Sequence, residues 1–243
     1  MTIEYILILS IIGVLSVIQS FFGMGVLVFG TPTLLLMGYD FITTLGYLLP
    51  ASFAISLLQV LTAGSNRVPI SHYLYLLCLP GIVIGLWLTD ASAITSWTNR
   101  LVGGTLLLSA LIRFWFPSQK MSAVLLDRYL PIYHLVMGVT HGLTNLGGAL
   151  LAILASGRNN EKDAIRYTIA HYYLAFSSIQ MLVLATTMEH YGILINNLST
   201  AVVAAVVYLL VGNRIFKRSN NQYYNFALSL FITAYGVAIL LRF

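Results

Sequence analysis

Charged residues are scarce in this sequence. Asp, Glu, Lys and Arg make up 8% of its 243 residues, whereas a soluble domain carries about 25%. Hydrophobic residues make up 59%, and the mean hydropathy is +0.89. Several apolar runs reach or approach the roughly 20 residues that span the hydrocarbon layer of a membrane. The composition therefore predicts an all-α polytopic membrane protein.

Cysteine and carboxylates within the predicted spans are also lacking. The single cysteine, Cys78, allows neither an internal disulfide nor a Cys-rich metal site. All seven Asp and Glu residues fall in predicted loops or at span ends, so no cation site or carboxylate proton relay is evident inside the membrane. Because the sequence contains neither a phosphate-binding loop nor a His-Glu-x-x-His motif, we expect no ATP hydrolysis, metal or cofactor. A Ser–His enzyme stays an alternative, although no nucleophile motif supports one.

The apolar runs divide the chain into two halves of five segments. We expect a single transmembrane domain, 1–243, with repeat one at 1–116, a connecting loop at 117–123 and repeat two at 124–243. The N-terminal run lacks a basic start and a clear cleavage site, so we interpret it as the first segment and not as a signal peptide. The predicted segments are 3–22, 24–38, 42–63, 70–89 and 97–116, then 130–142, 145–157, 163–187, 191–212 and 222–242.

Lys and Arg are distributed unevenly among the loops. Ten of the twelve fall in one set of loops, 64–69, 113–129, 157–166 and 213–221, and only Arg100 and Arg242 fall on the other side. The positive-inside rule makes the first set cytoplasmic and both termini external, in the inner membrane. The basic residues are thus explained by topology, and we expect no nucleic-acid partner.

This topology needs an odd number of crossings in each half. Either all five segments of a half span the membrane, or the two short segments belong to re-entrant pairs and three spans remain. The two repeats are then inverted relative to each other. Inverted repeats with broken or re-entrant helices are a recurrent construction of secondary transporters.

Two glycine-containing breaks look like copies of each other about 121 residues apart. Residues 23–25 (Gly-Met-Gly) fall opposite residues 145–147 (Asn-Leu-Gly). We expect a new helix to begin at each break, near Met24 and Leu146, with N–H groups and a positive dipole end that favour an anion. Two such ends facing each other would bind a compact oxyanion without a buried Lys or Arg. The alternative is that the glycines allow close helix packing.

Polar residues near the breaks complete the predicted site. His141 lies one turn before Asn145, and either His141 or His171 could carry a coupling proton, because imidazole titrates near neutral pH. A structural hydrogen bond is the alternative for His141. Ser56 and Ser177 could donate to substrate oxygens or bond their own helix backbone. The substrate-binding candidates are Gly23, Met24, Gly25, Ser56, Gln59, His141, Asn145, Gly147, Gly148, Ser177 and Gln180.

The break in the first half, Gly23-x-Gly25 followed by an apolar segment that contains Pro32, and its counterpart Asn145-x-Gly147-Gly148 resemble the sulfite exporter TauE/SafE family. The resemblance covers nearly the whole chain. It implies transport of small sulfur-containing anions such as sulfite, sulfonates or related organic acids. We therefore expect a secondary transporter that works by alternating access, with a small anion, the lipid bilayer and protons as partners. A passive anion channel, an intramembrane enzyme and a scaffold are the alternatives, and the oligomeric state stays open.

Overall fold

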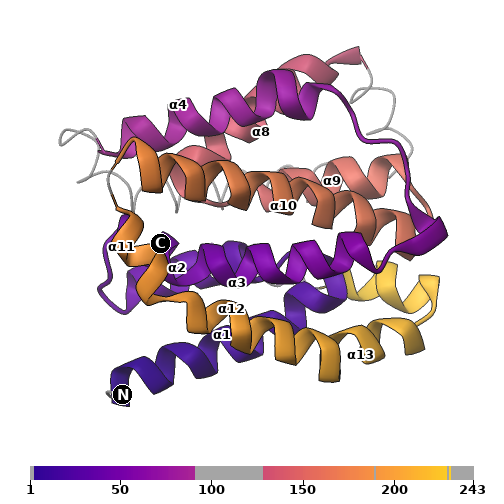
Figure 1. Cartoon of the computed structure of the whole chain (residues 1–243). Helices are drawn as coiled ribbons and strands as arrows, with labels where there is room; N and C mark the ends of the chain where they lie inside the picture. Colours follow the sequence, from indigo (N-terminus) through magenta and orange to yellow (C-terminus); the bar gives the residue numbers. More distant parts are fainter. Residues whose placement is uncertain (1–2, 91–127, 189, 229, 231–243) are drawn as a thin grey trace. The chain divides into compact units, whose positions relative to one another are not determined.

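The computed structural model describes residues 3–90, 128–188, 190–228 and 230 (Figure 1). Every regular element in these ranges is helical, which confirms the predicted all-α membrane class. Within them, four segments are long and apolar enough to cross a membrane: α1 (Ile3–Phe22), α3 (Phe41–Leu61), α10 (Lys162–Thr186) and the continuous stretch Leu198–Arg218. The predicted span 97–116 and loop 117–123 lie outside the described residues, and of 222–242 only the first residues are described, as a helix.

The chain divides into two compact units, and each is described here by itself. Unit 1 comprises Met1–Arg67 and Ile169–Ser219, and unit 2 comprises Val68–Thr168 and Asn220–Phe243. Each unit thus contains residues from both predicted repeats. The repeat boundaries and the inverted relation of the repeats stay predictions.

In unit 1, α1 and the shorter α2 (Val26–Leu36) form a helical hairpin. The hairpin begins and ends at the same end of the unit, because the Tyr39 hydroxyl, just after α2, donates a hydrogen bond to the Glu4 carboxylate in the first turn of α1. Helix α3 starts at this end too, where Asp40 caps it by accepting a hydrogen bond from the Thr43 N–H at 2.9 Å. Glu4 and Asp40 therefore mark one end of unit 1, as the topology prediction requires.

Three long elements of unit 1 run in the same direction. Alongside α1 and α3 lies a segment made of α11 (Tyr191–Asn196), α12 (Leu198–Val207), the π-helical turn η3 (Tyr208–Gly212) and α13 (Asn213–Arg218). The Tyr5 hydroxyl is hydrogen-bonded to Ser199 near the start of this segment, and Ser20 packs against Gly212 near its end. Figure 1 shows α1, α12 and α13 side by side.

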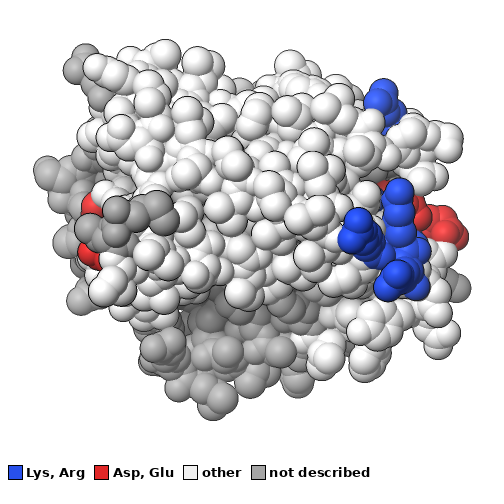
Figure 2. All heavy atoms as spheres, turned by 60° about the horizontal axis from the view of Figure 1, so that its bottom comes forward, with Lys and Arg blue, Asp and Glu red and all other residues white. Residues whose placement is uncertain are grey.

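The stretch from α11 to α13 differs from the predicted segment 191–212. Its first turn and a half forms the separate helix α11, and the helix of the remainder continues six residues further, through α13. Hydropathy missed this extension because α13 carries Arg214, Lys217 and Arg218. These cations suit a helix C-terminus, where they face the negative end of the helix dipole. On the face in Figure 2, Lys and Arg side chains gather at one end, with acidic side chains beside them, and a broad uncharged surface separates this end from further acidic side chains at the opposite end.

In unit 2, α4 (Leu79–Asp90) and α8 (Leu130–Thr144) pack together in parallel, backbone against backbone (Figure 1). A π-helical turn, η2 (Leu74–Cys78), leads into α4. Gly138 and Gly142 of α8 allow this approach: a Cβ added at either would lie 2.2 Å from a carbonyl oxygen of the opposing segment, that of Cys78 or Ile82. The opposing glycines on α4 are Gly81 and Gly85. Close packing of membrane helices through small residues four apart is a common arrangement.

One parallel helix pair in each unit joins the two predicted repeats. In unit 1, α1, the first segment of the predicted repeat one, packs in parallel with α12, in the fourth segment of the predicted repeat two. In unit 2, α4, in the fourth segment of the predicted repeat one, packs in parallel with α8, in the first segment of the predicted repeat two. Each pair therefore combines a first and a fourth predicted segment.

Candidate functional site

Both predicted breaks are present in the structure. Gly23, with φ +83°, ends α1, and Asn145, with φ +62°, ends α8. These residues stand 122 positions apart in the sequence, and both adopt the left-handed backbone conformation that stops a helix. Glycine enters this conformation without strain, and asparagine tolerates it better than most residues. The following helices, α2 and α9 (Gly148–Arg158), each begin two residues after the predicted start.

A buried glutamine that the sequence analysis did not single out organises the first break. The Oε1 of Gln19 accepts a hydrogen bond from the Val26 N–H, the first of α2, at 3.0 Å. Its Nε2 lies 3.1 Å from both the carbonyl oxygen and the Oγ of Ser52, and 3.2 Å from the Oγ of Ser56. All of these side chains are buried. Both ends of the Gln19 amide are therefore engaged, and the helix that follows the break is capped by the helix that precedes it.

Gln59 performs the complementary task at the end of α1. Its Nε2 donates to the carbonyl oxygens of Gln19 at 3.0 Å and of Ser20 at 3.1 Å. These carbonyls lie in the last turn of α1, where a helix runs short of its own N–H groups, although the Gln19 carbonyl also accepts from the Gly23 N–H at 2.7 Å. In a membrane, backbone groups freed by a break must find partners within the protein. Gln19 and Gln59 supply such partners on the two sides of the first break.

The second break is built differently. The Asn145 N–H donates to the His141 carbonyl at 2.7 Å, and the Leu146 N–H donates to the Thr144 Oγ1 at 3.3 Å. His141 and Asn145 are both fully buried. His141 stands six residues before Gly147, as Gln19 stands six residues before Gly25. The position of the capping glutamine in the first break is thus occupied by an imidazole in the second.

The second glycine of each break has a packing role. A Cβ added at Gly25 would lie 2.6 Å from the backbone nitrogen of Gln19. One added at Gly147 would lie 2.7 Å from the Cβ of His141 and 3.0 Å from the Met137 carbonyl oxygen. Each hairpin therefore requires glycine for its own tight closure, and substitution of these glycines by itself does not distinguish substrate contact from packing.

The two predicted serines differ from each other. The Oγ of Ser177 donates to the Tyr173 carbonyl of its own helix at 2.6 Å, which is the alternative considered for both serines. The Oγ of Ser56 instead accepts from Gln19. The structure thus joins Ser56 and Gln59 to the first break, and it joins His141, Asn145, Gly147 and Gly148 at the second.

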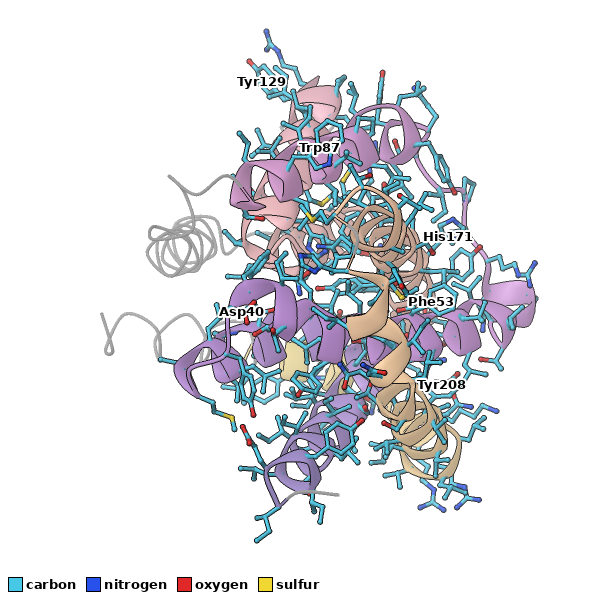
Figure 3. All side chains as sticks on the ribbon, turned by 60° about the vertical axis from the view of Figure 1, so that its left-hand side comes forward. Asp40, Phe53, Trp87, Tyr129, His171 and Tyr208 are labelled. Atoms are coloured by element: carbon cyan, nitrogen blue, oxygen red, sulfur yellow. The ribbon has the colours of Figure 1, made fainter. Side chains whose placement is uncertain are left out.

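The other candidates lie on α10. Gln180 is fully buried, and His171, labelled in Figure 3, is half-buried. Their relation to the breaks, like that of Ser177, stays a prediction. Arg166, in the second turn of α10, is the one buried charged side chain among the described residues. Its charge placed Arg166 in the predicted loop 157–166, although the predicted segment 163–187 also contains it.

These features describe a polytopic membrane protein with two helix breaks, each lined by buried uncharged polar side chains. That construction is found in membrane transporters. The chain belongs to the Sulfite exporter TauE/SafE family, which it matches over residues 7–239. The match confirms the resemblance seen in the sequence, and a family of membrane exporters fits the expectation that the chain is not an enzyme. No curated protein and no solved structure matches the chain.

Proposed function

We propose that this protein is a secondary transporter that carries a small sulfur-containing anion, such as sulfite, a sulfonate or a related organic acid, across the inner membrane by alternating access. Family membership over residues 7–239 is the observation that carries this proposal. The two breaks support it, since each places the start of a helix among buried polar groups, and helix starts favour anions.

The substrate contacts proposed are the residues of the breaks and the polar side chains beside them. In unit 1 these are Gly23, Met24, Gly25, Ser56 and Gln59, and in unit 2 they are His141, Asn145, Gly147 and Gly148. Ser177 and Gln180 are proposed because they occupy the repeat positions of Ser56 and Gln59. His141 and His171 are proposed to carry a coupling proton.

The end of unit 1 that carries Lys217 and Arg218 is proposed to face the cytoplasm, with Glu4 and Asp40 on the external side. Single cysteines at Ser219 and at the exposed Met37 would test this orientation in a variant whose buried Cys78 is replaced by alanine. An impermeant thiol reagent added to intact cells should label the cysteine at 37 and not the one at 219. The reverse pattern would overturn the orientation.

Flux in proteoliposomes tests the function. Purified protein should exchange external labelled sulfite or sulfonate for internal unlabelled anion, and a screen with sulfate, sulfonates and carboxylates would define the substrate. Counterflow supports a carrier, whereas conductance without exchange supports the passive channel. If neither is seen with any of these anions, the enzyme and scaffold alternatives take its place. Empty liposomes and protein carrying Asn145→Asp serve as controls.

A further inference from the structure

One face of α3 carries three buried polar side chains beside the first break. Ser52, Ser56 and Gln59 follow at spacings of four and three residues, which place them on the same side of the helix. Ser52 and Ser56 have no exposed surface, and Gln59 is 2% exposed. All three contact Gln19 of α1: the two serines through its side chain and Gln59 through its carbonyl. They form one polar cluster within unit 1.

The amide of Gln59 can have only one orientation. Its Nε2 donates to two carbonyl oxygens, those of Gln19 and Ser20, and a flipped amide would set oxygen against oxygen. Its Oε1 must therefore be the other end, and this atom is buried with no hydrogen-bond donor among the described residues. A buried acceptor without a partner is costly in free energy. The Gln59 Oε1 is therefore an acceptor that a donor on a bound molecule could satisfy.

The two serines present the opposite need. Each Oγ accepts from the Gln19 Nε2, so the proton of each hydroxyl is left to donate. No acceptor for either proton is found in the described parts of the chain. Other buried serines behave differently: Ser16 donates to Ile12 and Ser20 to Ser16, each to the carbonyl four residues earlier at 2.6 Å. The cluster therefore offers two hydroxyl donors and one fixed acceptor.

We propose that this cluster recognises the protonated monoanion of a small oxyanion. Ser52 and Ser56 donate to its unprotonated oxygens, and the Gln59 Oε1 accepts its O–H. This inference rests on the proposed function and narrows its substrate. A dianion lacks the proton that Gln59 needs, and so does a sulfonate. The anion then brings its own proton through the protein.

Binding of two probe anions tests the inference. Sulfite gains a proton near neutral pH to become hydrogensulfite, whereas methanesulfonate has no proton to gain in that range. Purified protein in nanodiscs is titrated with each anion between pH 5.5 and 8.5. At pH values above the pKa of hydrogensulfite, the Kd for total sulfite should rise about tenfold for each pH unit, because the fraction of protonated anion falls by that factor. The Kd for methanesulfonate reports any titration of the protein itself, so the ratio of the two constants isolates the proton on the substrate.

Variants assign the contacts. Ser52→Ala and Ser56→Ala should each weaken both anions by about tenfold to a hundredfold, the effect of one hydrogen bond to a charged group. The fold should survive, because Gln19 keeps the Ser52 backbone carbonyl as a partner. Gln59→Met should reduce the preference for hydrogensulfite and leave methanesulfonate binding unchanged. Ser16→Ala, whose hydroxyl is committed to its own helix, is the matched control and should bind both anions normally.

Three results would overturn the inference. A sulfite-to-methanesulfonate ratio that stays constant with pH removes the protonated substrate. Unchanged Kd values in both serine variants mean that buried water, and not substrate, satisfies the cluster. If neither probe binds at any pH, the proposed function fails together with this inference. The wild-type pH series and the serine variants decide the matter even if Gln59→Met does not fold.

Discussion

The side-chain oxygen of Gln19 lies 3.0 Å from the backbone nitrogen of Val26, across the break between α1 and α2. This single bond gives the first N–H of α2 a partner on the preceding helix. The amide nitrogen of the same side chain is anchored to α3 through Ser52 and Ser56. Gln19 therefore connects the three helices that surround the first break.

We predict that Gln19→Leu destabilises unit 1 by leaving the Val26 N–H buried without an acceptor. Such a loss costs about 1–3 kcal/mol. Thermal unfolding in detergent should show the decrease, and hydrogen exchange at the Val26 amide should accelerate. Ser16→Ala removes a hydroxyl bonded within its own helix and should change neither measurement appreciably. Unchanged exchange at Val26 in the leucine variant would show that the cap is unimportant.

We predict a specific order for substitutions at Asn145. The left-handed backbone there, with φ +62°, makes alanine a poor probe, because alanine is strained by about 1–2 kcal/mol in this conformation. Asn145→Gly removes the side chain without strain, so its loss of anion affinity, about tenfold to a hundredfold, would report the lost hydrogen bond. Asn145→Asp should bind worst, since it adds a negative charge. Equal affinity of the wild type, Gly and Asp proteins would place the anion elsewhere.

We predict that a coupling histidine controls the pH dependence of uptake. His141→Gln or His171→Gln should flatten the uptake profile between about pH 5 and 8, because glutamine keeps a hydrogen-bond donor but does not titrate there. Anion binding should partly survive. Two single variants that both retain the wild-type profile would assign these histidines a structural role, and would fit a substrate that carries its own proton.

We predict that α4 and α8 tolerate no side chain at their closest contact. A Cβ at Gly142 would meet the Ile82 carbonyl oxygen at 2.2 Å, and this backbone atom cannot move aside as a side chain could. Gly142→Ala should therefore lower the yield of monodisperse protein and its unfolding temperature. Gly192→Ala is the matched control, because nothing lies within 4 Å of its added Cβ and its φ is not positive. Equal stability of the two variants would contradict the packing described.

We predict that part of the acid sensitivity of this protein comes from Asp40, shown in Figure 3. Burial acts to raise the pKa of Asp40, but hydrogen bonds from Thr43 and nearby backbone outweigh it and hold the pKa below its ordinary value. A carboxyl with a lowered folded pKa stabilises the fold above the unfolded value of about 3.9, and this stabilisation is lost as the pH falls through the folded value.

Two substitutions separate the charge of Asp40 from its cap. Asp40→Asn keeps an oxygen that accepts from the Thr43 N–H but does not titrate, so its unfolding temperature should fall less steeply with acid than that of the wild type. Asp40→Ala loses the cap and should cost about 0.5–2 kcal/mol at neutral pH. Parallel curves for the wild type and Asp40→Asn would exclude Asp40 as a source of the acid sensitivity.

Hydropathy and the repeat predicted most of the described helices, because a run of apolar residues needs only its own length to be recognised. The breaks near Gly23 and Asn145 followed from comparing the two halves, whereas the left-handed conformation of these residues is seen only in the structure. Gln19 could not be identified in this way, because nothing in the sequence distinguishes a capping glutamine from any other single polar residue in an apolar run. Its partner Val26 comes near only when the chain folds back. A cue was present, however: Gln19 stands where repeat two has His141.

The glycine contacts of unit 2 escaped prediction for a related reason. Gly81 and Gly85 lie in the predicted repeat one, whereas Gly138 and Gly142 lie in the predicted repeat two. Two glycines four residues apart indicate close packing but do not indicate which helix packs against them. Helix α4 falls in the predicted repeat one and α8 in the predicted repeat two. Their contact therefore cannot be found by considering the sequence of either predicted repeat by itself.

Contacts between distant parts of the sequence also set an order in which unit 1 can form during synthesis. Gln19, Ser52, Ser56 and Gln59 bond with one another inside the first 59 residues. Tyr5, in contrast, meets Ser199 only after another 194 residues, which takes about 10–40 s at ribosomal speeds of about 5–20 residues per second. The polar groups around Gln19 can thus be buried soon after they are synthesised. The face of α1 that carries Tyr5 gains its partner only when the last third of the protein has been made.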